Sequence, residues 1–423
     1  MAANIKVYQG NQIGGCITVI STAKTKIVID FGENLPGSTR EDNIAFDWSK
    51  EKVDAVFFTH YHGDHIGRFM EIPKDVDLYM GEVTYKIMLN IRKELQDDEA
   101  VKFLNERLEN GSITFIDRDV PIKVGEDMTI TGYAVDHSAY DAYMFLVEAN
   151  GTSILHTGDF RDHGHRGHIF KNGEDHNIIL DVINHYVLQN GRRKVDVLII
   201  EGTMLGEREG EEYFSEKQLQ AWAKDYFTNH KHIFLKVSST NVDTLASFYN
   251  AGRSAGMTMY ANRYIRNQFR VYRAAGRKHG THMYDFGITK QLPFLSDKEG
   301  ADNTRALAKI EEMKKNGFIA IVSEYEYYEK MMDMFEDIHP QLIYSMWEGY
   351  LDPDKDAYNP ELLRFYEKYH GISKHTSGHA HKHLIEQVIT AVNPTQCIWP
   401  IHTEAVENFK KLNISEKLKN KLK

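Results

Sequence analysis

The sequence is poor in cysteine and proline and has no long apolar run. Two cysteines, Cys16 and Cys397, are too few for a disulfide framework and favour buried core thiols. Nine prolines and 30 glycines in 423 residues exclude a fibrous or low-complexity chain. No stretch approaches the roughly 20 apolar residues of a membrane-spanning helix, and the first residues lack the basic and apolar regions of a signal peptide. These absences predict a globular, cytoplasmic protein with no membrane partner.

Histidine is abundant, at 21 residues, in an otherwise ordinary globular composition. The formal net charge is −10, which by itself argues weakly against a nucleic-acid partner, because Lys and Arg drive phosphate binding. At roughly 100–200 residues per domain, the length predicts two or three domains. The histidines indicate either a metal site or scattered surface residues, and their positions decide between the two.

The pattern of the chain changes near residue 205. Before it, short β-branched and aromatic runs alternate with Gly, Asn and Asp, as strands and turns do, and Asn150-Gly151 predicts a hairpin. After it, apolar runs alternate with helical patterns, as βαβ units do. We therefore predict an α/β fold with a first domain at 1–204, an inserted α/β domain at 205–365 and a C-terminal return at 366–423. Helices are predicted near Asn241 and at 83–96, 101–109, 178–189, 262–278, 325–336 and 380–393.

A dense group of candidate metal ligands follows the apolar run AVFFT. The segment THYHGDHIGR holds His60, His62, Asp64 and His65. On a loop leaving a strand, residues two apart can point the same way, so His60 and His62 can bind one ion while Asp64 and His65 turn toward a second. Imidazole and carboxylate ligands suit zinc, with manganese as the alternative. A histidine-rich surface turn is disfavoured, because the loop follows a buried strand.

Three further residues lie at the ends of predicted strands. His137 follows MTITGYAVD and Asp159 follows SILHTG. A carboxylate that reaches both ions is common in two-metal hydrolytic sites, so Asp159 is the candidate bridge. Asp30, at the end of KIVID, is better placed to orient a ligand histidine from behind.

Four motifs resemble the metallo-β-lactamase fold superfamily, in its order along the chain. They are VIDFG, THYHGDHIG, DHSAYDAYMF and LHTGDF. The resemblance implies an αββα sandwich of two stacked sheets with a dinuclear metal site at their edge.

Three later motifs resemble one branch of that superfamily, the β-CASP nucleases and in particular the ribonuclease J family. They are IIEGT with Glu201, HTSGHA with His379 and IWPIHTE with His402. The resemblance implies that one ion is held by His60, His62 and His137, the other by Asp64, His65 and His402, and that Asp159 bridges them. It also implies that His379 contacts the scissile phosphate or protonates the leaving oxygen, and that Glu201 orients a neighbouring histidine.

The reaction implied by this resemblance is hydrolysis of a phosphodiester in single-stranded RNA by a hydroxide that two metal ions activate. In this branch RNA-processing members carry histidine at the position of His402 and DNA-processing members carry valine, so His402 favours RNA. The chain departs from ribonuclease J where that family has a phosphate-binding Ser/Gly-rich loop, since IVSEYEYYEKMMDMF stands here, with Ser323 before acidic and aromatic residues. Recognition of a 5′-phosphate is therefore an open question.

Each later motif has a simpler interpretation. Glu201 is alternatively a surface strand end, and SGHA a loop before a helix. The histidines of DHGHRGH, His163, His165 and His168, fit either a third metal site or a solvated, flexible insertion, and the insertion is favoured.

Positive charge is concentrated in residues 251–290. Eight basic residues and one acidic residue, Asp285, give this segment a local charge of +7. Within it, four arginines spaced 4, 3 and 4 residues apart line one face of a predicted helix with aromatic residues among them: Arg266, Arg270, Arg273 and Arg277. This face either binds RNA or pairs with acids of a neighbouring domain, and both interpretations stay open.

The sequence leaves three functional hypotheses. The first is a metal-dependent ribonuclease, endo- or 5′-exonucleolytic. The second is a hydrolase of the same fold that acts on a small ester, thioester or cyclic phosphodiester. The third is a non-catalytic RNA-binding subunit, which the complete set of candidate ligands argues against. A homodimer also stays open.

Overall fold

The computed structural model describes residues 3–35, 46–206, 208, 210, 213–296, 298 and 301–423. The chain divides into two compact units. The first comprises the chain up to Tyr213 together with Gly378–Lys423, and the second runs from Phe214 to Ser377. No helix in these described ranges combines the length and apolar character that crossing a membrane requires.

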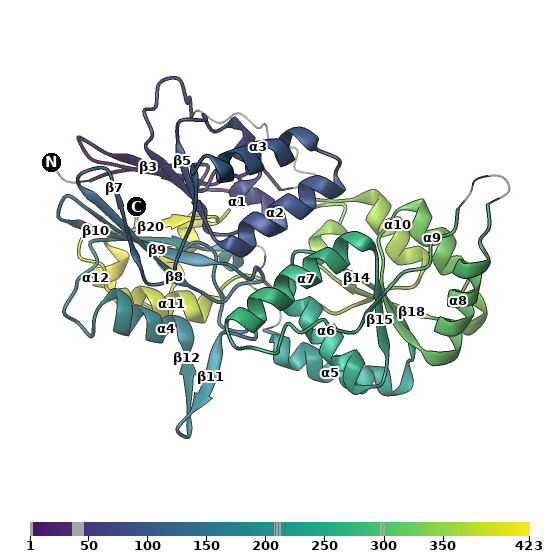
Figure 1. Cartoon of the computed structure of the whole chain (residues 1–423). Coiled ribbons are helices and arrows are strands. Elements are labelled where there is room, and N and C mark those ends of the chain that lie inside the picture. Colours follow the sequence, from purple (N-terminus) through teal and green to yellow (C-terminus); the bar gives the residue numbers. More distant parts are fainter. Residues whose placement is uncertain are drawn as a thin grey trace. The chain divides into compact units, whose positions relative to one another are not determined.

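The first unit contains two six-stranded sheets (Figure 1). The strands of the first sheet lie in chain order: β1 (Asn4–Tyr8), β2 (Ile17–Ser21), β3 (Lys26–Ile29), β4 (Ala55–Phe57), β5 (Asp77–Met80) and β6 (Ile113–Phe115). From β1 to β3 they pair antiparallel, and from β3 to β6 they pair parallel. Figure 1 shows α2 (Glu82–Glu94) and α3 (Asp98–Glu109) beside this sheet.

The second sheet joins the two ends of the unit's chain. Its order is β20 (Cys397–Ile401), β13 (Val197–Glu201), β10 (Thr152–His156), β9 (Tyr143–Ala149), β8 (Met128–Ala134) and β7 (Pro121–Val124). β10, β13 and β20 run parallel, so their carboxyl ends meet at one edge. The late strand β20 thereby brings the residue that follows it close to the carboxyl ends of β13 and β10, which come much earlier in the chain.

Apolar side chains hold the layers together. One core joins the inner faces of the two sheets, with Ile27 and Phe57 from the first and Phe145 and Ile199 from the second. A second core lies between the other face of the second sheet and its helices, α4 (Ile178–Val182), a π-helical turn (Ile183–Val187), α11 (Lys382–Val392) and α12 (Glu416–Lys419). The unit is therefore the αββα sandwich that the sequence predicts.

The second unit is built on one parallel sheet. Its order is β16 (Thr289–Gln291), β15 (Thr258–Ala261), β17 (Phe318–Ile321), β14 (His232–Val237), β18 (Gln341–Ser345) and β19 (Ile372–Ser373). Its helices are α5 (Glu216–Asn229), α6 (Val242–Ser254), α7 (Arg263–Lys278), α8 (Thr304–Asn316), α9 (Glu326–Asp333) and α10 (Pro360–Lys368). A buried cluster joins the sheet to α8, α9 and α10. The chain as a whole is thus a mixed α/β fold with an additional α/β unit.

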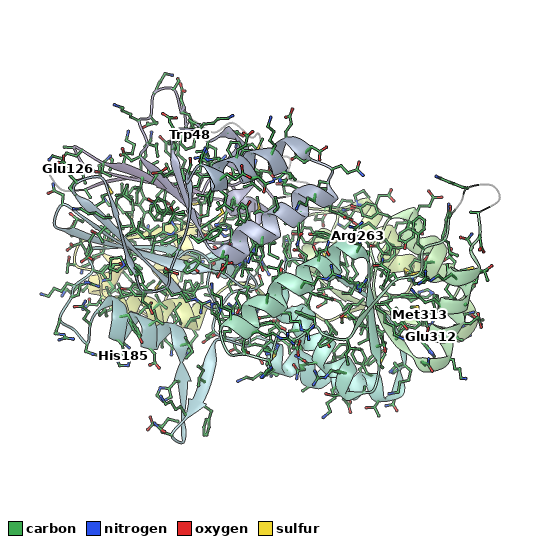
Figure 2. The ribbon with its side chains drawn as sticks, viewed as in Figure 1. Trp48, Glu126, His185, Arg263, Glu312 and Met313 are labelled. Carbon is green, nitrogen blue, oxygen red and sulfur yellow. The ribbon has the colours of Figure 1, made fainter. Side chains whose placement is uncertain are left out.

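Two adjacent residues of α8, Glu312 and Met313, show how these helices are anchored; both are labelled in Figure 2. Met313 is fully buried in the core, while its neighbour Glu312 is half exposed and forms an ion pair with Lys290. The apolar residue of each turn holds the helix to the sheet, and the charged residue keeps the outer face in water.

Most predicted helices lie where their apolar periodicity indicates, within a few residues. The segment predicted as one helix at 178–189 is instead the short α4 followed by the π-helical turn. The sequence interpretation also missed α5, α8 and α10. The hairpin at Asn150-Gly151 joins β9 and β10, with both residues at positive φ.

Candidate metal centre

The predicted site residues of the first unit lie at the carboxyl ends of strands from both sheets. Asp30 follows β3, and the loop with His60, His62, Asp64 and His65 follows β4. From the second sheet, His137 follows β8, Asp159 follows β10, Glu201 ends β13 and His402 follows β20. Chain segments more than 300 residues apart thus contribute to one cluster, because parallel strands place their carboxyl ends along one edge.

Three histidines form the first group of candidate ligands. His62 Nδ1 lies 3.0 Å from His60 Nε2 and 3.2 Å from His137 Nε2. The other ring nitrogen of His137 contacts the carbonyl of Gly378 at 2.6 Å, and Nδ1 of His60 contacts the hydroxyl of Thr59 at 3.0 Å. These outer contacts fix the rings so that the three remaining nitrogens converge.

Asp64, His65 and His402 form a second group. Asp64 Oδ2 lies 3.2 Å from His402 Nε2 and 3.7 Å from His65 Nε2. The Nδ1 atom of His402 lies 2.8 Å from Thr203 Oγ1, which leaves its Nε2 facing Asp64. All of these donor atoms lie within 4.8 Å of one another.

Asp159 lies between the two groups. One of its oxygens, Oδ2, is 4.0 Å from His60 Nε2 and 3.0 Å from His65 Nε2, and the other, Oδ1, is 3.9 Å from His402 Nδ1. The side chain is 2% exposed. This carboxylate therefore reaches histidines of both groups, the arrangement that a bridging ligand needs.

Glu201 and His379 lie next to Asp159. The Nδ1 atom of His379 is 3.3 Å from Glu201 Oε2 and 3.6 Å from Asp159 Oδ2. Glu201 is fully buried and accepts hydrogen bonds from the backbone N–H groups of Phe160, Thr203 and Ala380. It thus holds three chain segments together around His379, whose side chain keeps 16% of its surface exposed.

Asp30 supports the centre from behind. Its carboxylate accepts from the backbone N–H of Thr59 at 2.7 Å and from the Thr59 hydroxyl at 2.8 Å, and lies 2.8 Å from Nδ1 of His65. These contacts leave Nε2 of His65 for the centre. Thr59 is a residue that the sequence interpretation missed, although it directly precedes the histidine motif.

The charges of the cluster suit cation binding. Burial, followed by the neighbouring histidines, lowers the pKa values of His60 and His137 well below the usual range, and burial lowers that of His62 to about 4. These three rings are therefore neutral near pH 7 and offer lone pairs. Although burial opposes ionisation, His65 and His402 lower the pKa values of Asp64 and Asp159, so both carboxylates are ionised.

The donor set suits a divalent cation. Two ligands of a tetrahedral zinc ion, each about 2.0–2.1 Å from it, are about 3.3 Å apart, close to the 3.0 and 3.2 Å between nitrogens of the histidine group. Four groups of side chains in the described ranges could hold a metal ion, and all of them belong to this centre. Nitrogen and carboxylate donors suit zinc and also manganese.

The backbone is unusual at two of the strand ends. Asp30 and His402 each directly follow a strand and adopt left-handed φ values of 60° and 49°. For residues with a Cβ this conformation costs about 1–2 kcal/mol, so surrounding contacts must maintain it. The turn after each strand thereby aims the side chain along the sheet edge.

In the segment containing His163, His165 and His168, the first histidine is buried and the other two are partly buried, so the segment is less solvated than the favoured interpretation expects. His163 is 2% exposed, and the guanidinium of Arg166 donates to the carbonyls of His137, Ala139 and Tyr140. Arg166 thus braces the loop that carries His137. The sequence gave no signal for this role of Arg166, because its guanidinium contacts backbone carbonyls that lie 26–29 residues earlier in the chain.

The four predicted arginines lie on α7 in the second unit. Arg273 and Arg277 approach the same carboxylate, Asp285, at 2.5 and 3.8 Å, within their own unit. The aromatic residues Phe269 and Tyr272 among them are buried in the unit's core. The expectation that these rings are interleaved along a binding face was therefore wrong, while the arginine row remains.

Comparison with known proteins agrees with this geometry. Residues 25–226 match the family described as beta-lactamase superfamily domain. This part of the chain is a β-lactamase superfamily domain. Its matched region carries the loop after β4, His137, Asp159 and Glu201, whereas His379 and His402 reach the same centre from outside it.

Curated proteins to which part of this chain is similar are ribonucleases. Ribonuclease J of Helicobacter pylori is 29% identical over 160 residues, which cover 36% of this chain and 22% of that protein. Ribonuclease J of Mycoplasma genitalium is 30% identical over 158 residues (37% and 24%), and endoribonuclease YSH1 of Mycosarcoma maydis is 28% identical over 169 residues (36% and 19%). The matches thus span less than a quarter of these relatives' length.

A solved structure shares the fold over nearly the whole chain. A protein of unknown function from Enterococcus faecalis V583 superposes with a TM-score of 0.65, at 19% identity, over 96% of each chain. At this identity the likeness concerns the fold alone.

Proposed function

We propose that the chain is a metal-dependent phosphodiester hydrolase, a ribonuclease that cleaves single-stranded RNA with two divalent ions, zinc or manganese. The observation that carries the proposal is the meeting of His60, His62, Asp64, His65, His137, Asp159 and His402 in one buried cluster. The similarity to ribonuclease J and endoribonuclease YSH1 supports RNA as the substrate.

Each residue has a distinct proposed role. Two bound cations would supply positive charge for the phosphate and a water of lowered pKa as nucleophile. Asp159 reaches both ligand groups and so fixes their separation. His379 is more exposed than Asp159 and Glu201, which it contacts, so we assign it to the scissile phosphate and to protonation of the leaving oxygen. Glu201 keeps that ring in place.

The domain assignment belongs to the same proposal. We assign the first unit, up to Tyr213 together with Gly378–Lys423, to a metallo-β-lactamase domain and the second unit, Phe214–Ser377, to a β-CASP-like insertion. These bounds replace the expected 1–204, 205–365 and 366–423, because β19 pairs with β18 of the second unit. The separate parallel sheet of the second unit, which interrupts the chain between β13 and β20, supports this assignment.

We also infer that cleavage does not require a 5′-phosphate, and the contacts around Ser323 support this. The ammonium of Lys236 forms an ion pair with Glu324 and donates to the Ser323 hydroxyl at 2.9 Å. The local cation is therefore neutralised by a carboxylate of the same protein. We predict that an RNA with a 5′-monophosphate is cleaved within about twofold of the rate of the same RNA with a 5′-hydroxyl. A tenfold preference for the phosphate would contradict this.

The same neutralised cation favours a second candidate, a hydrolase of a small ester, thioester or cyclic phosphodiester. Such a substrate needs the metal centre but no phosphate contact in the second unit. The two candidates differ in their dependence on His379, which we assign to the scissile phosphodiester.

A cleavage assay tests the proposal. One labelled single-stranded oligonucleotide is offered as RNA and as DNA, each with and without a 5′-monophosphate, in zinc and in manganese separately. Wild-type protein should cleave the RNA, while His62→Ala, the control for contaminating nucleases, should not. His379→Ala should bind metal but lose RNA cleavage. Absence of cleavage in every arm would reject the ribonuclease, and esterase activity retained in His379→Ala would favour the small-substrate hydrolase.

A further inference from the structure

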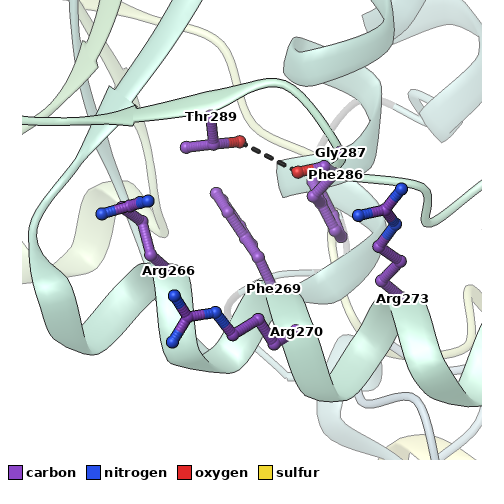
Figure 3. A pocket seen from close by; sticks show the side chains of 7 residues that line it. All are labelled: Arg266, Phe269, Arg270, Arg273, Phe286, Gly287 and Thr289. Atoms are coloured by element: carbon purple, nitrogen blue, oxygen red, sulfur yellow. Dashed lines mark hydrogen bonds between the residues drawn. The ribbon is translucent and has the colours of Figure 1, made fainter.

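The second unit contains a small pocket rich in arginine (Figure 3). It has a volume of about 100 Å³, and it lies between α7 and the segment that leads into the edge strand β16. Its lining includes Arg266, Phe269, Arg270, Arg273, Phe286 and Thr289. At about 30 Å³ per water molecule, this volume accommodates about three waters or one tetrahedral oxyanion.

The floor of the pocket is rigid and apolar. The rings of Phe269 and Phe286 stack with centroids 4.1 Å apart and an angle of 8° between their planes. Both side chains are less than 5% exposed, so their faces are not available to stack on a nucleobase. The rings instead support the arginine side chains, and whatever occupies the pocket is recognised by its charge.

The arginines carry more positive charge than the neighbouring acid neutralises. Arg273 and Arg277 share the single carboxylate of Asp285. Arg266 donates to the amide oxygen of Gln291 at 3.0 Å, and Arg270 to that of Asn267 at 2.8 Å, and both acceptors are neutral. A net charge of about +3 therefore remains on this face among the described groups.

The positive potential extends to a neighbouring helix. Burial and, after it, the charges of Arg305 and Arg266 lower the pKa of Lys309 on α8, although Glu312 opposes them. The α7 sequence RYIRNQFRVYRAAGRK contains no acidic residue. This positive potential favours the binding of an anion.

The wall of the pocket also contains a glycine with a steric role. A Cβ at Gly287 would lie 3.0 Å from Nη2 of Arg273 and 3.2 Å from its Cζ. The absence of a side chain therefore leaves room for this guanidinium beside Phe286 and Gly287 in the pocket wall (Figure 3). The hydroxyl of Thr289 donates to the Phe286 carbonyl at 3.2 Å.

We infer that this pocket binds a backbone phosphate of a single-stranded nucleic acid, without base recognition. Three guanidinium groups around a cavity of phosphate size match the several oxygens of a tetrahedral anion, and guanidinium binds phosphate with paired N–H donors. The row continues through Arg277, about 16 Å along the helix from Arg266, so neighbouring phosphates of the same strand can be contacted. This inference deepens the proposed function, since it supplies a strand-binding site on the second unit.

Binding measurements on the full chain test the inference separately from catalysis. The probe is a fluorescein-labelled oligouridine 12-mer with phosphorothioate linkages, checked for intactness on a gel. Fluorescence anisotropy gives the affinity at several salt concentrations, because each lost phosphate contact reduces the salt slope of a single strand by about 0.7. The variants are Arg266→Gln, Arg270→Gln and the double variant, with Arg253→Gln as the control. Arg253 is an exposed arginine on α6 of the same unit, outside this pocket.

The double variant should weaken binding on the order of tenfold near 0.1 M salt and lower the slope by about one or more. The Arg253→Gln control should bind as the wild type does. Thermal unfolding checks that each variant is folded. Arg270→Gln is the substitution least able to disturb the fold, because Arg270 is exposed and donates a hydrogen bond to Asn267 of the same helix.

Equal binding by wild type and double variant would overturn the inference. So would displacement of the strand by millimolar inorganic phosphate, which would assign the pocket to free anions, or preferential displacement by oligoglutamate, which would assign it to an acidic peptide. If the wild type cleaves RNA but the double variant binds the probe as tightly as the wild type does, only the assignment of this pocket is rejected. A binding difference without any RNA cleavage would reject the proposed ribonuclease alone.

Discussion

Asp30 shows how a residue outside the ligand set can control the centre. Its carboxylate contacts Nδ1 of His65 and two donors of Thr59, which fixes the ring whose other nitrogen faces Asp159. We predict that Asp30→Asn lowers zinc affinity about 10–100-fold, because an amide nitrogen cannot accept from the imidazole. Competition with a chromophoric chelator measures this affinity.

A matched control is available in the same unit. Asp141 is also buried and accepts from the backbone N–H of Val83 and the hydroxyl of Tyr143, away from the candidate ligands. Asp141→Asn should change stability but keep zinc affinity. If Asp30→Asn binds zinc as tightly as the wild type, the proposed orienting role is wrong.

At this scale the ligand types and the supporting carboxylate of Asp30 are readable from sequence, whereas other supports are not. The spacing of His60, His62 and His65 marks them as candidates because metal chemistry restricts which side chains serve. Thr203 and Arg166 carry no such chemical signature, since any hydroxyl or guanidinium in a suitable position makes the same contacts. Their roles depend on strand pairing and loop approach, which a single sequence does not contain.

The loop after β4 depends on a close backbone approach at Gly32. The segment from Phe31 to Glu33 hydrogen-bonds to the backbone of Gly63 and His65, and a Cβ on Gly32 would overlap the carbonyl of Asp64. Backbone atoms cannot rotate away from this overlap. Gly32→Ala is therefore expected to cost at least about 2 kcal/mol and to abolish tight metal binding, as followed by thermal unfolding and metal content.

Gly63, in the segment that hydrogen-bonds to Glu33, provides the comparison. A Cβ on Gly63 would meet nothing closer than the Glu33 carboxylate, at 4.0 Å. Gly63→Ala should accordingly retain both stability and metal. Equal behaviour of the two variants would show that the approach at Gly32 is unimportant.

The contact of α9 with α10 makes the stability of the second unit depend on pH. The Arg364 guanidinium and, after it, Lys368 lower the pKa of Glu329 to about 2, although burial opposes them. Because the folded pKa lies below the unfolded value of about 4.3, this group stabilises the fold above pH 4.3 and progressively less as the pH falls toward 2. We predict that Glu329→Gln loses about 1 kcal/mol at pH 7 and less at pH 3.5.

Urea unfolding followed by tryptophan fluorescence measures this difference. Glu326→Gln is the control, since Glu326 is exposed on the same helix and forms an ion pair with Lys330 one turn later. It should show little effect at either pH. A Glu329→Gln effect of equal size at pH 7 and pH 3.5 would contradict the pKa assignment.

Helices could be predicted from the sequence where apolar residues recur at regular spacing on one face. The helix predicted at 262–278 is α7 because Ile265, Phe269 and Tyr272 recur at helical spacing and are buried. In contrast, α8 has only Ile310 and Met313 fully buried among mostly polar residues, so tertiary packing and not periodicity determines it. The same holds for the π-helical turn after α4, which no local pattern indicates.

At the scale of the whole molecule, the chain forms two units, each with its own hydrophobic core. The change of pattern near residue 205 led us to expect a separate α/β unit, because apolar runs alternate with helical patterns beyond that point. The return of the chain to the first unit was expected from the change of pattern, and the resemblance of the late motifs indicated which residue it contributes. That return brings His402 to the centre.

The most direct test of the account is the initial rate of single-stranded RNA cleavage as metal is added back to metal-free protein. The account predicts no cleavage without metal, little with one equivalent, and a plateau near two equivalents, since both ligand groups and the carboxylate between them are needed. Cleavage that is independent of added metal, or its absence with both zinc and manganese at saturation, would contradict a two-metal ribonuclease.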